Sequence, residues 1–279
     1  MRLSFPDWLN ALLCAALAMS LGCGRASKSA ITIAGSTSVE PFAELLAEHY
    51  MALHPGIEIS VQGGGSSAGI RAVTSRICAI GMSSRELQPA ETSLVEIPIA
   101  LDAIALIVNA HNPVRRLTLA QARDVFSGRI RSWRELGGPD QSITAITREE
   151  GSGTRASFEE KVMVAGRPKS KDGKTEPAAF APDALVQDSN GAVREIVASD
   201  PAAIGYISSG LIDERVAAVA IGGVVPTEAA IRSGKYPVVR RFLFLTNGEA
   251  TGTAQAFINY VLSDSGQKAL VEEGLTRIK

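Results

Sequence analysis

Three segments rich in glycine and hydroxyl side chains stand where an expected strand gives way to an expected helix: residues 35–38, 63–67 and 151–154. Glycine lets a ligand approach the backbone closely. The free N–H groups and the positive dipole end of a helix N-terminus favour a bound anion, and hydroxyls add donors that can rotate toward it. We therefore expect these three segments to form anion-binding loops.

The repetition of the pattern gives it weight. A single junction means little, because Ser and Thr are ordinary helix caps. In a parallel sheet, however, all such loops lie at the carboxyl edge of the strands, where α/β proteins bind ligands. Ser84 belongs to a similar fourth loop, and Arg148 ends the strand before residues 151–154. The Arg148 guanidinium can make a planar two-pronged contact with an oxyanion; a surface pairing with Glu149 or Glu150 is the alternative.

A rival chemistry comes from residues 65–69 (GSSAG), which fit the nucleophile elbow of a hydrolase with Ser67 as nucleophile. Such an enzyme needs an acid and then a histidine downstream, and only His111 follows Ser67; His49 and His54 precede it. The chain also has no phosphate loop of the GxxxxGK[ST] type and no Cys/His spacing typical of zinc. We expect no catalytic residue, cofactor or metal, and keep a Ser67 hydrolase or a phosphatase as the enzyme alternative.

The elements that must position these loops alternate along the chain. This alternation predicts an α/β fold with mostly parallel sheets, and its two blocks predict two lobes. Pro41 places the start of the first helix near Ser38, because proline is tolerated in a first helical turn. Residues 166–183 are expected to form an exposed loop. Strand patterns cover residues 31–34, 57–61, 79–82, 103–108, 143–147, 204–207 and 241–246, and helical patterns 42–53, 70–77, 119–126, 158–162, 193–197 and 254–262, with a last helix ending at Gly274.

Composition and charge limit the classes of protein. The chain has 279 residues, of which 46% are hydrophobic and 20% charged, and this is typical of one large or two medium globular domains. Its net charge is −1. No general attraction to nucleic acid or to an anionic membrane follows from that charge. Any anion binding must therefore come from local geometry.

The N-terminal segment differs from the rest. An apolar run over residues 11–21 follows Arg2 and is too short to span a bilayer as a helix. It predicts a secretory signal peptide over residues 1–23. Gly22 before Cys23 indicates cleavage there and lipid attachment to the Cys23 thiol, although Ser20 stands where such signals usually have Leu. Cleavage without a lipid is the alternative.

Cysteine usage predicts no disulfide. Cys14 would leave with the signal and Cys23 would carry lipid, so Cys78 would stand alone in the mature chain. Cys78 lies among apolar neighbours, and we expect it to be a small core residue.

Several longer stretches together resemble one family, the periplasmic phosphate-binding components of bacterial phosphate ABC transporters. The resemblance runs from about Ile31 to the C-terminus. It implies a type II periplasmic-binding fold, in which two lobes are joined by two crossing segments. The matching stretches are IAGSTSVEPF, VQGGGSSAGI, IGMSSREL, VFSGRIRSWRELGG, REEGSGTRASFE, SNGAV, AIGYI and YPVVRRFLFLTNGEATGTAQAFINYVLSDSGQKALVEEG.

The resemblance also implies roles for individual residues. Glu150 corresponds to the acid that orients the ligand arginine in the family, and Asn190 in SNGAV is expected beside the site. Ser84 stands where one branch of the family has an Asp that accepts the phosphate hydroxyl. The residues implied to contact phosphate are Thr37, Ser38, Ser66, Ser84, Arg148, Ser152, Gly153 and Thr154.

The function implied is high-affinity binding of inorganic phosphate in the cell envelope and its delivery to the permease subunits of an ABC transporter. The protein would be a monomer that binds no nucleic acid and meets the membrane only through the lipid on Cys23. Alternatives are a binding protein for another tetrahedral oxyanion, such as sulfate or arsenate, and a lipoprotein that senses phosphate without transporting it. The expected divisions are the signal peptide 1–23, a tether 24–29, a first lobe of residues 30–102 and 243–279, and a second lobe of residues 103–242.

Overall fold

The structure is a computed structural model that describes residues 29–170 and 172–278. The predicted signal peptide, Cys23 and nearly all of the predicted tether lie outside the described residues. No helix in the part of the chain that is described is long and apolar enough to cross a membrane.

Strands and helices alternate along the whole of the described chain, as the sequence predicts. The first half contains β1 (Ser29–Gly35), α2 (Glu40–Leu53), β2 (Ile57–Gln62), α3 (Ser66–Thr74), β3 (Ile80–Ser83), β4 (Val95–Asn109), β5 (Arg116–Leu117), α4 (Leu119–Phe126) and β6 (Thr144–Arg148). The second half contains α5 (Gly153–Phe158), β7 (Leu185–Gln187), α6 (Asn190–Ser199), β8 (Ala203–Ser208), β9 (Val216–Ile221), α7 (Glu228–Arg232), β10 (Val239–Thr246), α8 (Gly252–Leu262) and α9 (Asp264–Glu272).

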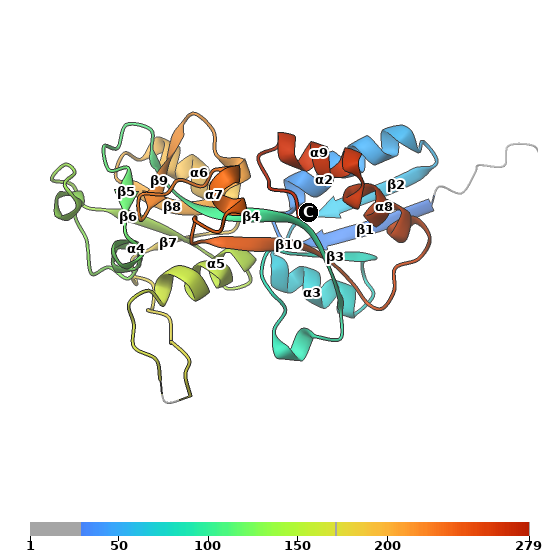
Figure 1. Ribbon diagram of the computed structural model, residues 1–279, viewed down its shortest axis with the longest axis horizontal. Coiled ribbons are helices and arrows are strands. Elements are labelled where there is room, and N and C mark those ends of the chain that lie inside the picture. Colours follow the sequence, from blue (N-terminus) through green and yellow to red (C-terminus); the bar gives the residue numbers. More distant parts are fainter. Residues whose placement is uncertain (1–28, 171, 279) are drawn as a thin grey trace, which may run out of the picture.

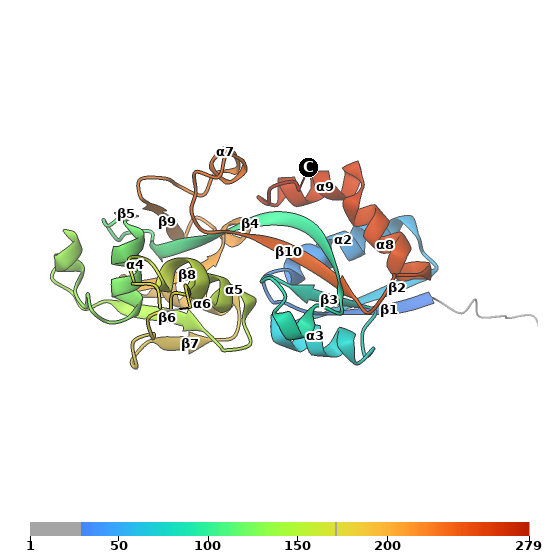
Figure 2. The same cartoon turned by 60° about the horizontal axis from the view of Figure 1, so that its bottom comes forward.

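Two strands connect the two halves of the molecule. The strand order is β2-β1-β3-β10-β4-β8-β6-β7, with β9 pairing with β4 and β5. The outer pairs β1–β2, β1–β3, β6–β8 and β6–β7 are parallel, whereas β4 and β10 run antiparallel to each other and to their neighbours β3, β8 and β9. The expectation of mostly parallel sheets therefore holds on the flanks and fails at the crossing. Figures 1 and 2 show β4 and β10 side by side between two lobes.

Each lobe has its own apolar core. In the first lobe, α2, α8 and α9 pack on one face of the sheet and α3 on the other (Figure 1). In the second, Phe126, Phe158 and Tyr206 form an aromatic cluster on one face, and α6 packs on the other. Along β4 the core contacts change from the first lobe to the second between Ala100 and Ala103. The lobes are thus separate hydrophobic units that share two strands.

The crossing strands are buried and apolar on both faces over residues 103–108 and 242–245, as the continuous run over residues 103–108 predicts. In β10, Phe242 and Phe244 enter the core under α2 and α8, while Leu243 and Leu245 enter the core under α3. In β4, Leu106 packs in one core of the second lobe and Ile107 in the other. A strand buried on both faces cannot show the polar alternation of a surface strand.

Several elements differ from the predictions. The β4 strand begins at Val95, eight residues before the predicted strand. Its first part is a strand because it pairs with β10, and the side chains of residues 95–98 are exposed or only partly buried, so this part lacks the continuous apolar run of residues 103–108. The helix predicted through Ile77 ends at Thr74. Arg76 then turns the chain with φ 56°, and Ile77 is exposed. The first helix begins at Glu40 instead of near Ser38. Among the strands and α-helices of the described residues, four had no prediction: β5, β7, β9 and α7.

A close contact between α3 and the sheet fixes the position of the second loop. An added Cβ on Gly69 of α3 would lie 2.6 Å from the carbonyl oxygen of Ala34 and 2.6 Å from Cα of Gly35. Real side chains do not approach backbone atoms so closely. Gly69 therefore allows α3 to start close to the carboxyl end of β1, where two of the predicted anion loops lie.

We expect Gly69→Ala to lower the free energy of unfolding by about 1–3 kcal/mol, because overpacking against backbone cannot be relieved by a rotamer change. Alanine in a helix interior would otherwise favour folding by about 1 kcal/mol over glycine. Urea unfolding measures the change. Gly191→Ala in α6 is the matched control, since its Cβ would meet nothing closer than Ser189 Oγ at 3.9 Å. A gain in stability for both variants would contradict the close contact.

Candidate functional site

The predicted anion loops of the two lobes meet at the crossing strands. Three hydrogen bonds join them: Ser38 Oγ to Thr154 Oγ1 at 2.6 Å, Arg148 Nη2 to Thr37 Oγ1 at 2.9 Å, and the backbone N–H of Ser67 to the carbonyl of Gly151 at 3.2 Å. The first-lobe loops follow β1 and β2, and the second-lobe loop follows β6. Loops far apart in sequence are thus brought into one site, as the sequence predicts.

Helix starts supply part of each loop. The N-cap residues Val39 of α2 and Gly65 of α3 give no side-chain hydrogen bond to their helices. At the start of α2, however, the Ser38 N–H donates to Ser36 Oγ at 3.2 Å, the Glu40 N–H donates to the Ser36 carbonyl at 2.9 Å, and Pro41 has no N–H. Ser152 does cap α5, since its hydroxyl accepts from the N–H of Arg155. Ser152 is buried, and its predicted contact with the anion would use its own hydroxyl proton, because its backbone N–H donates to the carbonyl of Glu149 at 3.0 Å.

Three buried serines form a hydroxyl cluster on the first-lobe side. Ser36 Oγ donates to Ser84 Oγ at 2.8 Å, and the backbone N–H of Ser84 donates to Ser66 Oγ at 3.0 Å. None of the three is more than 2% exposed. Ser66 and Ser84 were expected here, whereas Ser36 was not named among the site residues. Its place beside Thr37 in the first loop is the sequence signal that could have included it.

Gly153 fits against this cluster from the other lobe. A Cβ on Gly153 would lie 2.3 Å from Ser66 Oγ and 2.6 Å from Ser84 Oγ. A side chain at this position would therefore collide with the hydroxyls of the facing lobe. The backbone of the second lobe can approach Ser66 and Ser84 only because position 153 is glycine.

Arg148 is the main cation of the site, and it is only 1% exposed. Its Nη2 donates to Thr37 Oγ1 and to the carbonyl of Asp188, both at 2.9 Å. Its Nε donates to the carbonyl of Gln187 at 3.2 Å. Its Nη1 is buried and has no partner among the described residues. The guanidinium is thus fixed on one side and retains a free donor on the other.

The carboxylate beside Arg148 is Glu149, not Glu150 as expected. Glu149 Oε2 accepts from Arg148 Nε at 3.0 Å, and Oε1 accepts from Nη2 at 3.1 Å. The turn closed by the N–H of Ser152 and the carbonyl of Glu149 directs the chain away from the strand. Glu150 lies on that turn and is exposed. The pair is nevertheless no surface pair, because Arg148 is buried.

Asn190, expected beside the site, contacts both lobes. Its Nδ2 donates to Ser38 Oγ at 2.9 Å and to the carbonyl of Thr37 at 3.4 Å. Its Oδ1 accepts from the backbone N–H of Ser208 at 3.1 Å. Asn190 therefore ties the start of α6 in the second lobe to the first loop of the other lobe.

A buried ion pair on the crossing strands was missed by the sequence reasoning. Arg240 Nε lies 2.8 Å from Asp102 Oδ2, and Arg240 Nη1 donates to Thr154 Oγ1 at 2.8 Å. Burial raises the pKa of the Asp102 carboxyl, against the opposing effect of the Arg240 charge. The sequence does show a charged residue near each apolar strand segment, Asp102 before residues 103–108 and Arg240 before residues 242–245. Because a buried charge requires a partner, these two residues could have been predicted to pair.

The hydrolase alternative finds no catalytic arrangement in the described chain. Ser67 Oγ accepts a hydrogen bond from Arg85 Nη2 at 3.4 Å. Among the described residues, Ser67 forms no hydrogen bond with a histidine. His111 is exposed. Within residues 29–170 and 172–278, no group of three or more His, Cys, Asp or Glu side chains could hold a metal ion.

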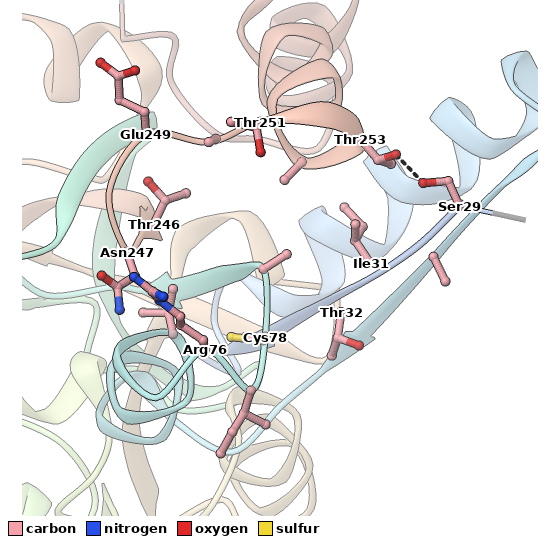
Figure 3. A pocket seen from close by; sticks show the side chains of 16 residues that line it. Ser29, Ile31, Thr32, Arg76, Cys78, Thr246, Asn247, Glu249, Thr251 and Thr253 are labelled. Carbon is pink, nitrogen blue, oxygen red and sulfur yellow. Dashed lines mark hydrogen bonds between the residues drawn. The ribbon is translucent and has the colours of Figure 1, made fainter.

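A pocket lies away from the anion loops, beside the starts of β1 and α8 (Figure 3). Its volume is about 530 Å³. Cys78 at its wall is buried, as expected, and burial raises the pKa of its thiol. The lining residues labelled in Figure 3 are Ser29, Ile31, Thr32, Arg76, Cys78, Thr246, Asn247, Glu249, Thr251 and Thr253. None of the residues predicted to contact phosphate lines this pocket.

Several known proteins are similar to this chain in sequence and in fold. A family profile described as a PBP superfamily domain matches residues 24–265. Phosphate-binding protein PstS of Bacillus subtilis is 33% identical over 95% of this chain and 91% of the relative, and PstS of Borreliella burgdorferi is 30% identical over 89% and 90%.

Solved structures agree with this assignment. A substrate-binding protein from Clostridium perfringens, solved with phosphate bound, superposes with a TM-score of 0.82 and 36% identity over 90% of this chain and 100% of the other. An ABC-type phosphate transport receptor from Vibrio cholerae gives a TM-score of 0.71 and 37% identity over 89% and 100%. The family profile, the sequence identities and the shared two-lobed α/β fold together show that this chain belongs to the PstS phosphate-binding proteins of the PBP superfamily.

Proposed function

We propose that this protein binds inorganic phosphate between its two lobes and delivers it to an ABC transporter in the cell envelope. The observation that carries the proposal is the buried Arg148, whose Nη1 has no partner among the described residues while its Nη2 donates to Thr37 Oγ1 of the other lobe. Relatives that are named for phosphate binding, and one solved with phosphate bound, support the same ligand.

The chemistry of the site suits a tetrahedral oxyanion. An ion removed from water is costly unless its oxygens are hydrogen-bonded. The proposed shell offers a guanidinium N–H from Arg148, backbone N–H groups at the helix starts, and several hydroxyls. The residues proposed to contact phosphate remain Thr37, Ser38, Ser66, Ser84, Arg148, Ser152, Gly153 and Thr154, with Glu149 and Asn190 supporting them.

Closure of the lobes would complete the shell. Because the donors come from both lobes, phosphate would bind the closed form more tightly than the open form and shift the equilibrium toward it. We place the lobe boundaries in the crossing strands, near residue 102 in β4 and residue 242 in β10. The core contacts change sides close to these points. The closed form would be the one that the permease subunits recognise, and one monomer would suffice.

We propose a binding role without catalysis. Ser67 is held near Arg85, and nothing in the described chain places a general base beside it. A phosphatase or an esterase would need such a group. Assay of the purified protein with an activated phosphoester tests this point, and turnover that disappears in Ser67→Ala would overturn it.

Selectivity between phosphate and sulfate depends on Ser84 in this proposal. Phosphate near neutral pH carries at least one O–H group, whereas sulfate carries none. A carboxylate at this position would accept that proton and repel sulfate. The Ser84 hydroxyl accepts from Ser36 at 2.8 Å and lies 3.3 Å from Ser66 Oγ, and because a hydroxyl can rotate it can accept from phosphate or donate to sulfate. We therefore infer that phosphate is preferred by a smaller margin than in a site with a carboxylate.

The test is a competition titration of the mature protein with phosphate, arsenate and sulfate, for wild type and Ser84→Asp at one pH and one salt concentration. We expect wild type to bind phosphate most tightly, and Ser84→Asp to widen the phosphate-to-sulfate ratio by rejecting sulfate, because a repelled charge in a dry site costs several kcal/mol. A wild type that binds sulfate best would refute the proposed function. A large ratio left unchanged by Ser84→Asp would place selectivity at another residue.

Arg148→Lys tests the two-pronged contact. Lysine keeps the charge but loses the planar fork, and phosphate affinity should fall by about 1–3 kcal/mol, the scale of a lost hydrogen bond to a charged group. Glu149→Gln should weaken binding less, by loosening the guanidinium. Glu150→Gln is the control for that change, since it removes the same charge from an exposed position. Unchanged calorimetric affinity in Arg148→Lys would remove Arg148 from the site.

We further propose that Cys23 carries a lipid after signal cleavage and holds the protein at the outer face of a membrane. The support is the short apolar run before Gly22-Cys23. In cell fractionation, wild type should remain with membranes, whereas Cys23→Ser should be soluble or remain unprocessed. Equal fractionation and identical mass of the two mature proteins would show that Cys23 is not lipidated.

A further inference from the structure

Arg240 and Asp102 are direct partners across the two strands that connect the lobes. They are register neighbours in the β10–β4 ladder, and their side chains are 2% and 0% exposed. Ser208 Oγ donates to the second oxygen of Asp102 at 2.7 Å and so fixes the carboxylate. The pair is therefore a rigid, buried element at the place where the lobes join.

Stability alone explains such a pair poorly. Removing two charges from water costs about as much as their attraction returns, and apolar residues of similar size often serve a core as well. The contacts of the remaining guanidinium nitrogens give a better explanation. Arg240 Nη1 donates to Thr154 Oγ1 in the second lobe at 2.8 Å and to the carbonyl of Ser84 in the first lobe at 3.4 Å. Arg240 thus contacts two residues of the proposed phosphate shell.

The hydrogen-bond directions show what Arg240 does to Thr154. Thr154 Oγ1 accepts from Arg240, and Ser38 Oγ accepts from Asn190 Nδ2. The two hydroxyls share one hydrogen bond of 2.6 Å, which uses one of their two protons. The other proton is free to donate to a third group. A bound oxyanion is such a group, and it requires donors.

Arg240 also brings a second positive charge close to the site. Burial lowers the pKa of the Arg240 guanidinium, and the positive charge of Arg148 acts in the same direction. Arg240 Nη2, like Arg148 Nη1, is buried and has no partner among the described residues. Two guanidinium groups with free buried donors therefore lie at the proposed site, Arg148 against Thr37 Oγ1 and Arg240 against Thr154 Oγ1.

We propose that Arg240 is a positioning residue of the phosphate site, which holds the hydrogen-bonded hydroxyls of Thr154 and Ser38 so that one of their protons can be donated to the bound anion, and adds a second positive charge beside them. Asp102 orients Arg240 for this task. The inference rests on the proposed phosphate-binding function. It extends the site to the crossing strands, because Arg240 lies on β10, one of the two strands that connect the lobes.

The main test is the paired variant Asp102→Asn with Arg240→Gln, which removes both charges and leaves no uncompensated ion in the core. Calorimetry should show phosphate binding weakened roughly ten- to hundredfold, the range that follows from losing a hydrogen bond to a charged group. In a Thr154→Val background the same paired change should weaken binding by less than about threefold, because the hydroxyl through which Arg240 acts is already gone.

Two further variants separate positioning from a merely structural role. Arg240→Lys keeps the charge beside Asp102 but cannot reach Asp102 and Thr154 with one planar group, and it should also weaken binding. Arg123→Gln is the matched control, since Arg123 is a buried arginine paired with Asp124 on α4, outside the site. It should lower the unfolding temperature without changing phosphate affinity.

The outcomes are decisive for Arg240 whether or not the paired variant folds. If it is folded with unchanged affinity, or if its loss is equally large in the Thr154→Val background, the proposal is wrong. If it does not fold, unchanged affinity in Arg240→Lys overturns the proposal and weakened affinity at an unchanged unfolding temperature supports it. Wild type is titrated with phosphate in the same series, so failure of the proposed function itself would appear there first.

Discussion

The structure depends on the cost of removing a small anion from water. Each oxygen of such an ion must receive hydrogen bonds from the protein, since an unpaired charge in a dry site is too unfavourable to persist. One loop cannot surround a tetrahedron, so the donors must converge from several directions. Two lobes that each present strand-to-helix loops meet this requirement. The apolar cores, the parallel flanks and the glycines of the loops all serve to bring these donors together.

The crossing strands therefore have two tasks. They join the lobes, and with Asp102 and Arg240 they carry charge into the centre of the site. A flexible linker could perform the first task but could not hold a guanidinium in place. In the ladder between β4 and β10, Arg240 stands directly opposite Asp102. The register of this ladder shifts two residues later, between Phe242 and Leu243. Mechanical and electrostatic functions thus share the same few residues.

The sequence predicted the parts of the fold and site that depend on local patterns. The three glycine-hydroxyl loops, the helix α4 over residues 119–126 and the strand at residues 103–108 all appear where sequence periodicity places them. What it could not predict depends on partners far away in the chain. Asp102 and Arg240 are 138 residues apart, and the first part of β4 is a strand because β10 lies beside it. The choice of Glu149 over Glu150 was set by one turn, which side-chain types do not specify.

The close approach of Gly153 to the other lobe sets an upper limit on the size of the ligand that the closed site can hold. Where the lobes meet at Ser66 and Ser84, not even a methyl group fits on the facing backbone. An organic phosphate carries carbon on one of its oxygens, and on this side of the site that carbon would hold the lobes apart. Exclusion of metabolites that bear the same phosphoryl group would then follow from bulk alone. The protein could scavenge the inorganic ion in the presence of sugar and nucleoside phosphates without any contact devoted to rejecting them.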